Sequence, residues 1–504
     1  MKKNRKKTPS DLSRREFLGR TGASVTLAAG AALAPFALSG CSGGGTTSGG
    51  TPKKVDGPGP GPGPGPSTTP SRPTPPFPDT KPAKSDGLPD GDPVKVGILH
   101  SLTGTMAISE ISLKEVELMA IDEINAAGGV VFGGKKHKIE AVIEDPESKF
   151  TDVFPEKAKK LLLKDKVAVV FGCWTSVSRK NVLPVFEENN GLLFYPVQYE
   201  GNECSPNIVY TGAAPNQQII PAVDWLLEDI EKRTKKKPKD QKWYLIGTDY
   251  VFPRTANLIV IEYLRKVKGV DIDPKKYEKY TGFGHKDYAT IVQDIKAYGP
   301  DVVFSTINGD SNINFYNEMA TAGLTADKCP ICAVSVGEDE LRGLDKLDAF
   351  KGHYAAWNYY QSLDTPANKE FVKRFKAKYG KDRVTDDPIE AAYFQVYFWK
   401  LAVELANSIE VDEVRKAFKN KDGNPAIGIE APGGKVMLDP ETQHTYKFFR
   451  MGKIREDKQF DIVYETPIVR PEPYPQEVFE GWNCNWVKNP KKGQTKGKEV
   501  KIGS

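Results

Sequence analysis

The stretch Val167-Ala168-Val169-Val170-Phe171-Gly172-Cys173-Trp174-Thr175-Ser176-Val177-Ser178 passes from an uninterrupted apolar run into a turn rich in hydroxyl groups. An apolar run without alternation predicts a strand that is buried on both faces, as in a parallel sheet. The hydroxyl groups that follow predict the start of a helix, which the apolar spacing extends to Glu188. This strand, turn and helix together predict an α/β fold.

Units of the same kind lie on both sides of this stretch, in two series of similar plan. The first series has predicted strands at 94–99, 138–144 and 192–195, and helices at 108–127 and 152–163. The second has strands at 243–247, 301–306 and 330–334, and helices at 217–231, 256–267, 287–297 and 313–322. Helices at 368–379 and 389–406 follow, then a tail with strands at 445–451 and 460–464. The chain has 504 residues, 39% of them hydrophobic, which is enough for the two α/β lobes that this alternation predicts.

Candidate site residues lie in the loops after the predicted strands, because open parallel sheets bind ligands beyond the carboxyl ends of their strands. The first series contributes Trp174 and Ser176 in the turn quoted above, and Tyr195 and Gln198 after the next strand. Backbone N–H groups and hydroxyls at a helix start can bind a carbonyl oxygen or an anion. The alternative is structural: Ser176 and Ser178 cap the helix, and the loop after Tyr195 is a proline turn.

The second series contributes Tyr250, Asn308, Asp310 and Glu338, which supply hydroxyl, amide and carboxylate groups. The structural alternatives are that Asp310 caps the next helix and that Glu338 is a first-turn acid favoured by the helix dipole. These loops contain few cations, whereas a site for an amino acid would pair both of its charges. The loops therefore suit a small, neutral, planar ligand rich in N–H donors, held between aromatic walls.

Common catalytic motifs are missing from the sequence. It contains five His, none in an H-E-x-x-H arrangement, and neither a G-x-S-x-G elbow nor a Walker loop. Composition alone leaves a hydrolase without zinc open, but we predict a protein that is not an enzyme and uses no metal and no cofactor. Cys329 and Cys332 have the spacing of a redox motif but precede no helix, which favours structural thiols or a local disulfide. Apart from Cys41 there are five cysteines, so at least one lacks an intramolecular partner; we leave the pairing among 173, 204, 329, 332 and 484 open.

The amino-terminal region carries the positive charge of the chain. Residues 1–20 contain eight basic and two acidic residues, so the remaining 484 residues sum to about −1 of the total +5, which argues against nucleic-acid binding. Arg14 and Arg15 lie in a segment that resembles the twin-arginine export motif, and Cys41 ends a segment that resembles a lipobox. We expect residues 1–40 to be a signal peptide and Cys41 to be lipidated. Residues 42–92 contain 25 Gly or Pro among 51 residues, and we expect them to form a disordered tether. Together with the lipidated Cys41 they make up the region 41–92.

Several blocks of the sequence closely resemble substrate-binding proteins of branched-chain-amino-acid-type ABC transporters, and among them the urea-binding proteins and, more distantly, the amide-sensing regulators. These blocks are FGCWTS (171–176), YPVQYEG (195–201), SPNIVYTGAAPNQ (205–217), DVVFSTINGDS (301–311) and AWNYYQS (356–362). The resemblance covers about residues 93–490. It implies a bilobed, hinged periplasmic-binding-protein fold of type I, with two Rossmann-like parallel-sheet lobes. Both lobes are discontinuous: lobe 1 is expected at 93–213 and about 366–410, and lobe 2 at about 214–365 and 411–504.

The resemblance also implies a function. In the amide sensors a Ser and a Tyr hold the ligand, and these positions are Ser176 and Tyr250 here, with Trp174 as the aromatic residue before the Ser. A Thr of the sensors is replaced by Val197, which favours urea over acetamide-like ligands. We therefore expect a lipid-anchored periplasmic or cell-surface protein, exported by the twin-arginine route, that binds urea or a short amide and delivers it to ABC permease subunits. The alternatives are a sensor of amides, urea or branched-chain amino acids with the same fold, and an extracytoplasmic amidase.

Overall fold

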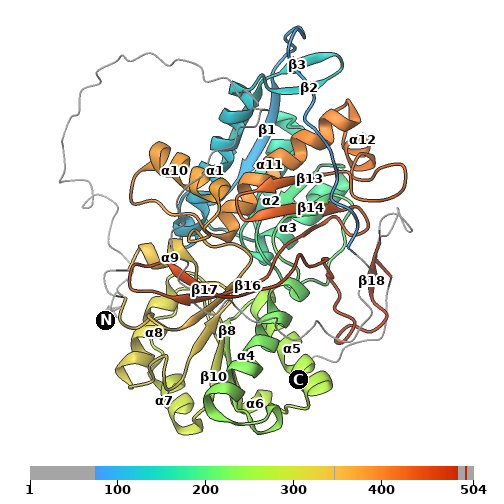
Figure 1. The fold of residues 1–504 in the computed structure, drawn as a ribbon. Coiled ribbons are helices and arrows are strands. Elements are labelled where there is room, and N and C mark those ends of the chain that lie inside the picture. Colours follow the sequence, from blue (N-terminus) through green and yellow to red (C-terminus); the bar gives the residue numbers. More distant parts are fainter. Residues whose placement is uncertain (1–73, 345–346, 486–493, 496–504) are drawn as a thin grey trace, which may run out of the picture. The chain divides into compact units, whose positions relative to one another are not determined.

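The computed structural model describes residues 74–344, 347–485 and 494–495 (Figure 1). The predictions for residues 1–73, including the export motif at Arg14 and Arg15 and the lipidation of Cys41, lie outside this part of the chain. No helix in the described part is long and apolar enough to span a membrane.

The first lobe is built on an eight-stranded sheet in the order β13-β14-β15-β7-β6-β5-β1-β4. Five neighbouring strands, β7, β6, β5, β1 and β4, are parallel to one another. At the edge of the sheet β14 is antiparallel to both β13 and β15, and β15 runs parallel to β7. The strands are β1 (Val94–Leu99), β4 (Ile139–Glu144), β5 (Val170–Gly172), β6 (Leu193–Tyr195), β7 (Ile208–Tyr210), β13 (Gly428–Ala431), β14 (Gly434–Asp439) and β15 (His444–Tyr446). The helices are α1 (Ala107–Ala126), α2 (Val153–Lys159), α3 (Ser176–Glu188), α10 (Pro366–Tyr379), α11 (Asp387–Ala406) and α12 (Val411–Lys416), and β2 (Val130–Phe132) and β3 (Lys135–His137) form a hairpin.

The second lobe is built on a seven-stranded sheet in the order β17-β16-β12-β11-β10-β8-β9. Its strands are β8 (Trp243–Thr248), β9 (Glu278–Thr281), β10 (Val302–Thr306), β11 (Ile331–Ala333), β12 (Tyr354–Trp357), β16 (Arg450–Ile454) and β17 (Phe460–Glu465), the last two antiparallel to their neighbours. Its helices are α4 (Ile219–Thr234), α5 (Val251–Tyr263), α6 (Pro274–Tyr277), α7 (Ala289–Tyr298), α8 (Ser311–Thr321) and α9 (Glu338–Arg342). Trp243 and Leu245 pack in a core with α4 and α5, whereas Tyr244 and Ile246 pack in a second core with α7 and α8. Burial on both faces confirms the parallel-sheet prediction for the apolar runs.

The chain crosses from one lobe to the other three times, after β7, after β12 and after β15. Buried side-chain amides connect the crossing segments. Gln217 donates to the carbonyl oxygen of Thr445, and Asn358 donates to that of Gln217, both over 2.9 Å. At the third crossing the Nζ atom of Lys447 lies 3.3 Å from Oδ1 of Asp387, with both side chains buried. Three crossings make both lobes discontinuous, as the resemblance implied.

The tail differs from the expected division of the chain. The segment from α12 to β15 belongs to the first lobe, because β13 pairs with β14 and β15 pairs with β7, whereas 411–504 was expected in the second lobe. The single strand expected at 445–451 is two strands in different sheets. It breaks because the ion pair of Lys447 and the backbone bond from Lys447 to Val469 hold residue 447 at the crossing.

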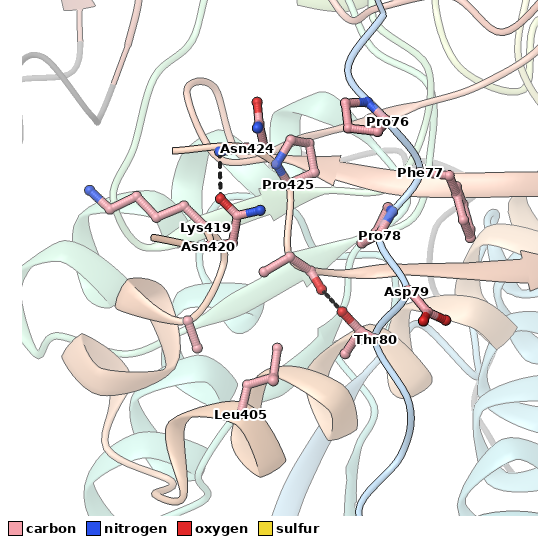
Figure 2. A pocket seen from close by; sticks show the side chains of 12 residues that line it. Pro76, Phe77, Pro78, Asp79, Thr80, Leu405, Lys419, Asn420, Asn424 and Pro425 are labelled. Carbon is pink, nitrogen blue, oxygen red and sulfur yellow. Dashed lines mark hydrogen bonds between the residues drawn. The ribbon is translucent and has the colours of Figure 1, made fainter. Parts of the chain in front are cut away.

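The segment before β1 also differs from its prediction, because part of the expected tether has defined contacts with the first lobe. The Thr80 hydroxyl donates to the carbonyl oxygen of Ala426 (Figure 2), and the backbone N–H of Ala83 donates to Glu404 over 3.0 Å. A surface pocket of about 470 Å³ lies between residues 76–80 and the loop 417–426. Contacts of this kind continue to Gly91, whose N–H donates to the carbonyl oxygen of Lys136.

One disulfide joins Cys204, in the loop after β6, to Cys484 in the tail. Cys173, Cys329 and Cys332 are free and buried, so the local disulfide considered for Cys329 and Cys332 is wrong and the structural-thiol interpretation agrees with the structure. Burial raises the pKa of the Cys329 thiol to about 12, which makes it a poor nucleophile near neutral pH.

Candidate functional site

The turn after β5 positions the first group of candidate residues. Cys173 has a left-handed backbone with a φ of 67°, which ends the strand and directs the chain into α3. Thr175 caps this helix, because its side chain accepts from the backbone N–H of Ser178 over 3.1 Å. The expected alternative, capping by Ser176 or Ser178, is therefore wrong, and the Ser176 side chain takes part in other contacts.

Ser176 belongs to a buried polar network. Its hydroxyl donates to Oε2 of Glu200 over 2.5 Å and accepts from the guanidinium of Arg179 over 3.1 Å. A hydroxyl has one proton and two lone pairs, so one lone pair of Ser176 remains for another donor. Ser176 and Glu200 are each only 1% exposed, and Arg179 is fully buried.

Aromatic rings enclose the guanidinium of Arg179. Its central carbon lies 4.7 Å from the ring centre of Tyr195 and 4.5 Å from that of Tyr199, distances that allow cation–π attraction. The Tyr195 hydroxyl donates to the backbone carbonyl of Trp174 over 2.6 Å, which joins the end of β6 to the turn after β5. Trp174 and Tyr195 thus form, with Ser176, one assembly in the first lobe, as the sequence predicted for neighbouring strand ends.

The second lobe brings Tyr250 and Asn308 together. The Tyr250 hydroxyl donates to Oδ1 of Asn308 over 2.9 Å, and the Asn308 backbone N–H donates to Thr248 over 2.9 Å. Burial raises the pKa of Tyr250 well above its usual range, and electrostatic interaction with Tyr195 and Glu200 of the first lobe raises it further. Tyr250 is therefore close enough to the first-lobe assembly to interact with it electrostatically.

Gln198 connects the two lobes directly. Its side-chain N–H donates to the carbonyl oxygen of Val334, after β11, over 2.9 Å. Its Oε1 atom is buried and has no hydrogen-bond partner among the described residues. Gln198 thus has an acceptor atom available close to the second lobe.

Two predicted site residues lie elsewhere. Asp310 is exposed beside the start of α8, and its side chain forms no capping hydrogen bond, so the capping alternative is wrong as well. Glu338 is buried at the start of α9, where its Oε1 accepts from the backbone N–H of Gln361 over 2.7 Å. Burial raises the pKa of Glu338 to about 8, and the charges of Glu340 and Asp387 add to the shift. Glu338 thus lies close to the carboxylates of Glu340 and Asp387, and among the described residues no hydrogen bond joins it to Ser176 or Tyr250.

Sequence reasoning missed Arg179, Glu200 and Glu203. Arg179 follows Ser176 by three residues and so lies on the same face of α3, a spacing that could have suggested contact. Glu200 was quoted only as part of a block, and Glu203 was not considered, because charged residues in loops are usually solvated. Among the residues that the structure describes, no group of three His, Cys, Asp or Glu could hold a metal ion.

Comparison with known proteins places the chain in a family. Residues 94–480 match the model of the periplasmic binding protein domain. "Leu/Ile/Val-binding protein homolog 8" of Brucella abortus is 26% identical over 364 residues, which cover 68% of this chain and 84% of the relative.

Solved structures show the same fold at low identity. A solute-binding protein of an ABC transporter from Rhodopseudomonas palustris, in complex with 3,4-dihydroxybenzoic acid, aligns with a TM-score of 0.61 and 20% identity over 75% of this chain and 97% of its own. A leucine-binding protein from Thermotoga maritima aligns with a TM-score of 0.59 and 17% identity over 75% and 99%. With its two α/β lobes and three crossings, the chain belongs to the periplasmic binding protein family and has the bilobed type I fold.

Proposed function

We propose that this protein is the solute-binding component of an ABC transporter, which binds urea or a short amide between its lobes and delivers it to permease subunits. The family and the fold support a binding protein, and the similar Rhodopseudomonas palustris protein is a solute-binding protein of an ABC transporter. Binding between lobes that are joined by a hinge gives the ligand a means of shifting the protein toward a closed state.

The direction of the hydrogen bonds carries the ligand assignment. The Ser176 hydroxyl gives its proton to Glu200, and the Tyr250 hydroxyl gives its proton to Asn308. Both oxygens can therefore only accept from a ligand, and the carboxylate of Glu200 also only accepts. A ligand that satisfies these groups must supply N–H donors, as urea and amides do.

Charge supports the same assignment against carboxylate ligands. The two cations of this assembly, Arg179 and Lys180, are both paired with Glu200 and Glu203. A benzoate or an amino acid would bring a carboxylate to a site whose positive charge is already compensated. The carbonyl oxygen of urea, in contrast, needs only neutral donors, such as the first backbone N–H groups of α3, which have no partner within the helix.

Calorimetric titration tests this proposal. We expect urea to bind, acetamide to bind more weakly, and leucine and 4-hydroxybenzoate not to compete. Asp310→Asn serves as a control, because Asp310 is exposed and outside the assembly, and this variant should bind urea like the wild type. Tight binding of leucine or 4-hydroxybenzoate without any binding of urea would overturn the assignment.

We also propose export by the twin-arginine route through Arg14 and Arg15, and anchoring of the mature protein by a lipid on Cys41. The Cys204–Cys484 disulfide supports an oxidising compartment outside the cytoplasm. Mass spectrometry of the membrane-bound protein should find a lipidated peptide that begins at Cys41, and Cys41→Ser should release the protein from the membrane. Membrane retention of Cys41→Ser would contradict the anchor.

A further inference from the structure

Glu203 forms ion pairs with Arg179 and Lys180 next to the proposed ligand site. It accepts from Nε of Arg179 over 2.8 Å, from Nζ of Lys180 over 2.9 Å and from the hydroxyl of Tyr210 over 2.7 Å. The residue is 5% exposed, and although burial alone would raise its pKa, the charges of Arg179 and Lys180 lower it to about 2. Glu203 is therefore ionised at physiological pH.

The other end of the same network reaches the candidate ligand residues. Nη1 of Arg179 donates to Ser176, and Nη2 donates to Oε1 of Glu200 over 3.1 Å, while the second oxygen of Glu200 accepts from Ser176. Arg179 thus fixes Ser176 and Glu200, and Glu203 fixes Arg179. The network balances two cations, Arg179 and Lys180, against two carboxylates, Glu200 and Glu203.

We infer that Glu203 is a positioning residue that determines which ligand charge the site accepts. Because it compensates the charge of Arg179, the site selects uncharged ligands with N–H donors over carboxylates. The inference rests on the proposed function and deepens it. Without the charge of Glu203 the network would carry a net positive charge in a water-poor environment, where electrostatic attraction of an anion is strong. A guanidinium whose charge is not compensated also favours a carboxylate through charge-assisted hydrogen bonds.

Acetamide and acetate are matched probes for this inference, because they have nearly the same shape and differ in charge. We expect the ratio of the two affinities, acetamide over acetate, to fall at least about tenfold in Glu203→Gln relative to the wild type. The control is Glu188→Gln, which makes the same change at an exposed position at the end of the same helix and should leave the ratio unchanged.

A second variant separates charge from structural damage. Lys180 has a side chain that is 35% exposed and pairs with the same two carboxylates, so Lys180→Gln removes a positive charge from the network. The acetamide-over-acetate ratio should then rise, opposite to its change in Glu203→Gln. Because Lys180 is partly exposed, this variant keeps the inference testable if Glu203→Gln fails to fold.

The outcomes are distinct for the two proposals. If the wild type binds neither urea nor acetamide, the proposed function is wrong and this inference falls with it. If the wild type binds urea, two results show that only the inference about Glu203 is wrong. One is an acetamide-over-acetate ratio that is unchanged in Glu203→Gln. The other is a ratio that changes in the same direction in Glu203→Gln and Lys180→Gln. If Glu203→Gln does not fold, an unchanged or lower ratio in Lys180→Gln likewise overturns it. Opposite shifts of the ratio support it.

Discussion

Replacement of Glu338 by Gln should change how the stability of the protein depends on pH. Glu338 is 1% exposed, one of its oxygens accepts from Gln361, and the other has no partner among the described residues. The pKa of this carboxyl is raised to about 8, first by burial and then by the charges of Glu340 and Asp387. The folded protein therefore retains a proton at Glu338 that the unfolded chain has lost near neutral pH.

The size of the effect follows from linkage between proton binding and folding. A carboxyl whose pKa is raised on folding contributes its stability fully below the unfolded pKa, and the contribution is lost as the pH rises through the folded pKa. Between pH 5 and pH 7.5 Glu338 should therefore lower the free energy of unfolding by about 1.4 kcal/mol per pH unit, or about 3 kcal/mol in all. Glu338→Gln keeps the acceptor for Gln361 and removes this dependence.

Thermal unfolding of both proteins by scanning calorimetry, at half-unit steps across this pH range, measures the difference. We expect the variant to gain stability relative to the wild type as the pH rises. The Asp310→Asn control makes the same kind of change at an exposed carboxylate. Parallel curves for the wild type and Glu338→Gln would refute the reasoning, because they would mean that Glu338 has the same pKa in both states.

Two other changes have definite expected outcomes. Tyr250→Phe removes the hydroxyl that bonds to Asn308 and that is proposed to accept from the ligand, so urea affinity in calorimetric titration should fall by roughly 1–2 kcal/mol; unchanged affinity would place the ligand elsewhere. Reduction of the Cys204–Cys484 disulfide opens a loop of 280 residues and should lower the free energy of unfolding by roughly 2–5 kcal/mol. The unfolding temperature should therefore be lower with reductant than without it. The Cys204→Ser/Cys484→Ser variant should show no response to reductant.

The central strands of both sheets could be predicted from the sequence because their apolar runs are continuous. The strand expected at 243–247 is β8, and that expected at 301–306 is β10, each within a residue at either end. The edge strand β9 was missed, since the sequence Glu278-Lys279-Tyr280-Thr281 is half charged and only its last residue is buried. The break between β15 and β16 could not be predicted, because aromatic residues lie on both sides of Lys447 and the strand is interrupted by contacts of this residue with Asp387 and Val469, which are distant in the sequence.

The candidate site could be predicted in part. The rule that ligands lie beyond strand ends selected Trp174, Ser176 and Tyr195, which the structure places in one network. The same rule selected Glu338, but its hydrogen bond with Gln361 and its proximity to Asp387 could not be predicted, because both partners come from later segments of the chain. Arg179 was missed because a buried arginine is stable only with partners such as Glu203, and sequence spacing does not reveal that pairing.

A crystal structure of the protein grown with urea would show where the ligand binds. We expect urea between the lobes, with its N–H groups within hydrogen-bond distance of the Ser176 hydroxyl oxygen, the Glu200 carboxylate and the Tyr250 hydroxyl oxygen. Arg179 should keep its bonds to Glu200 and Glu203 in the complex. Urea bound elsewhere, or a carboxylate ligand from the host seated on Arg179 in place of Glu203, would contradict this expectation.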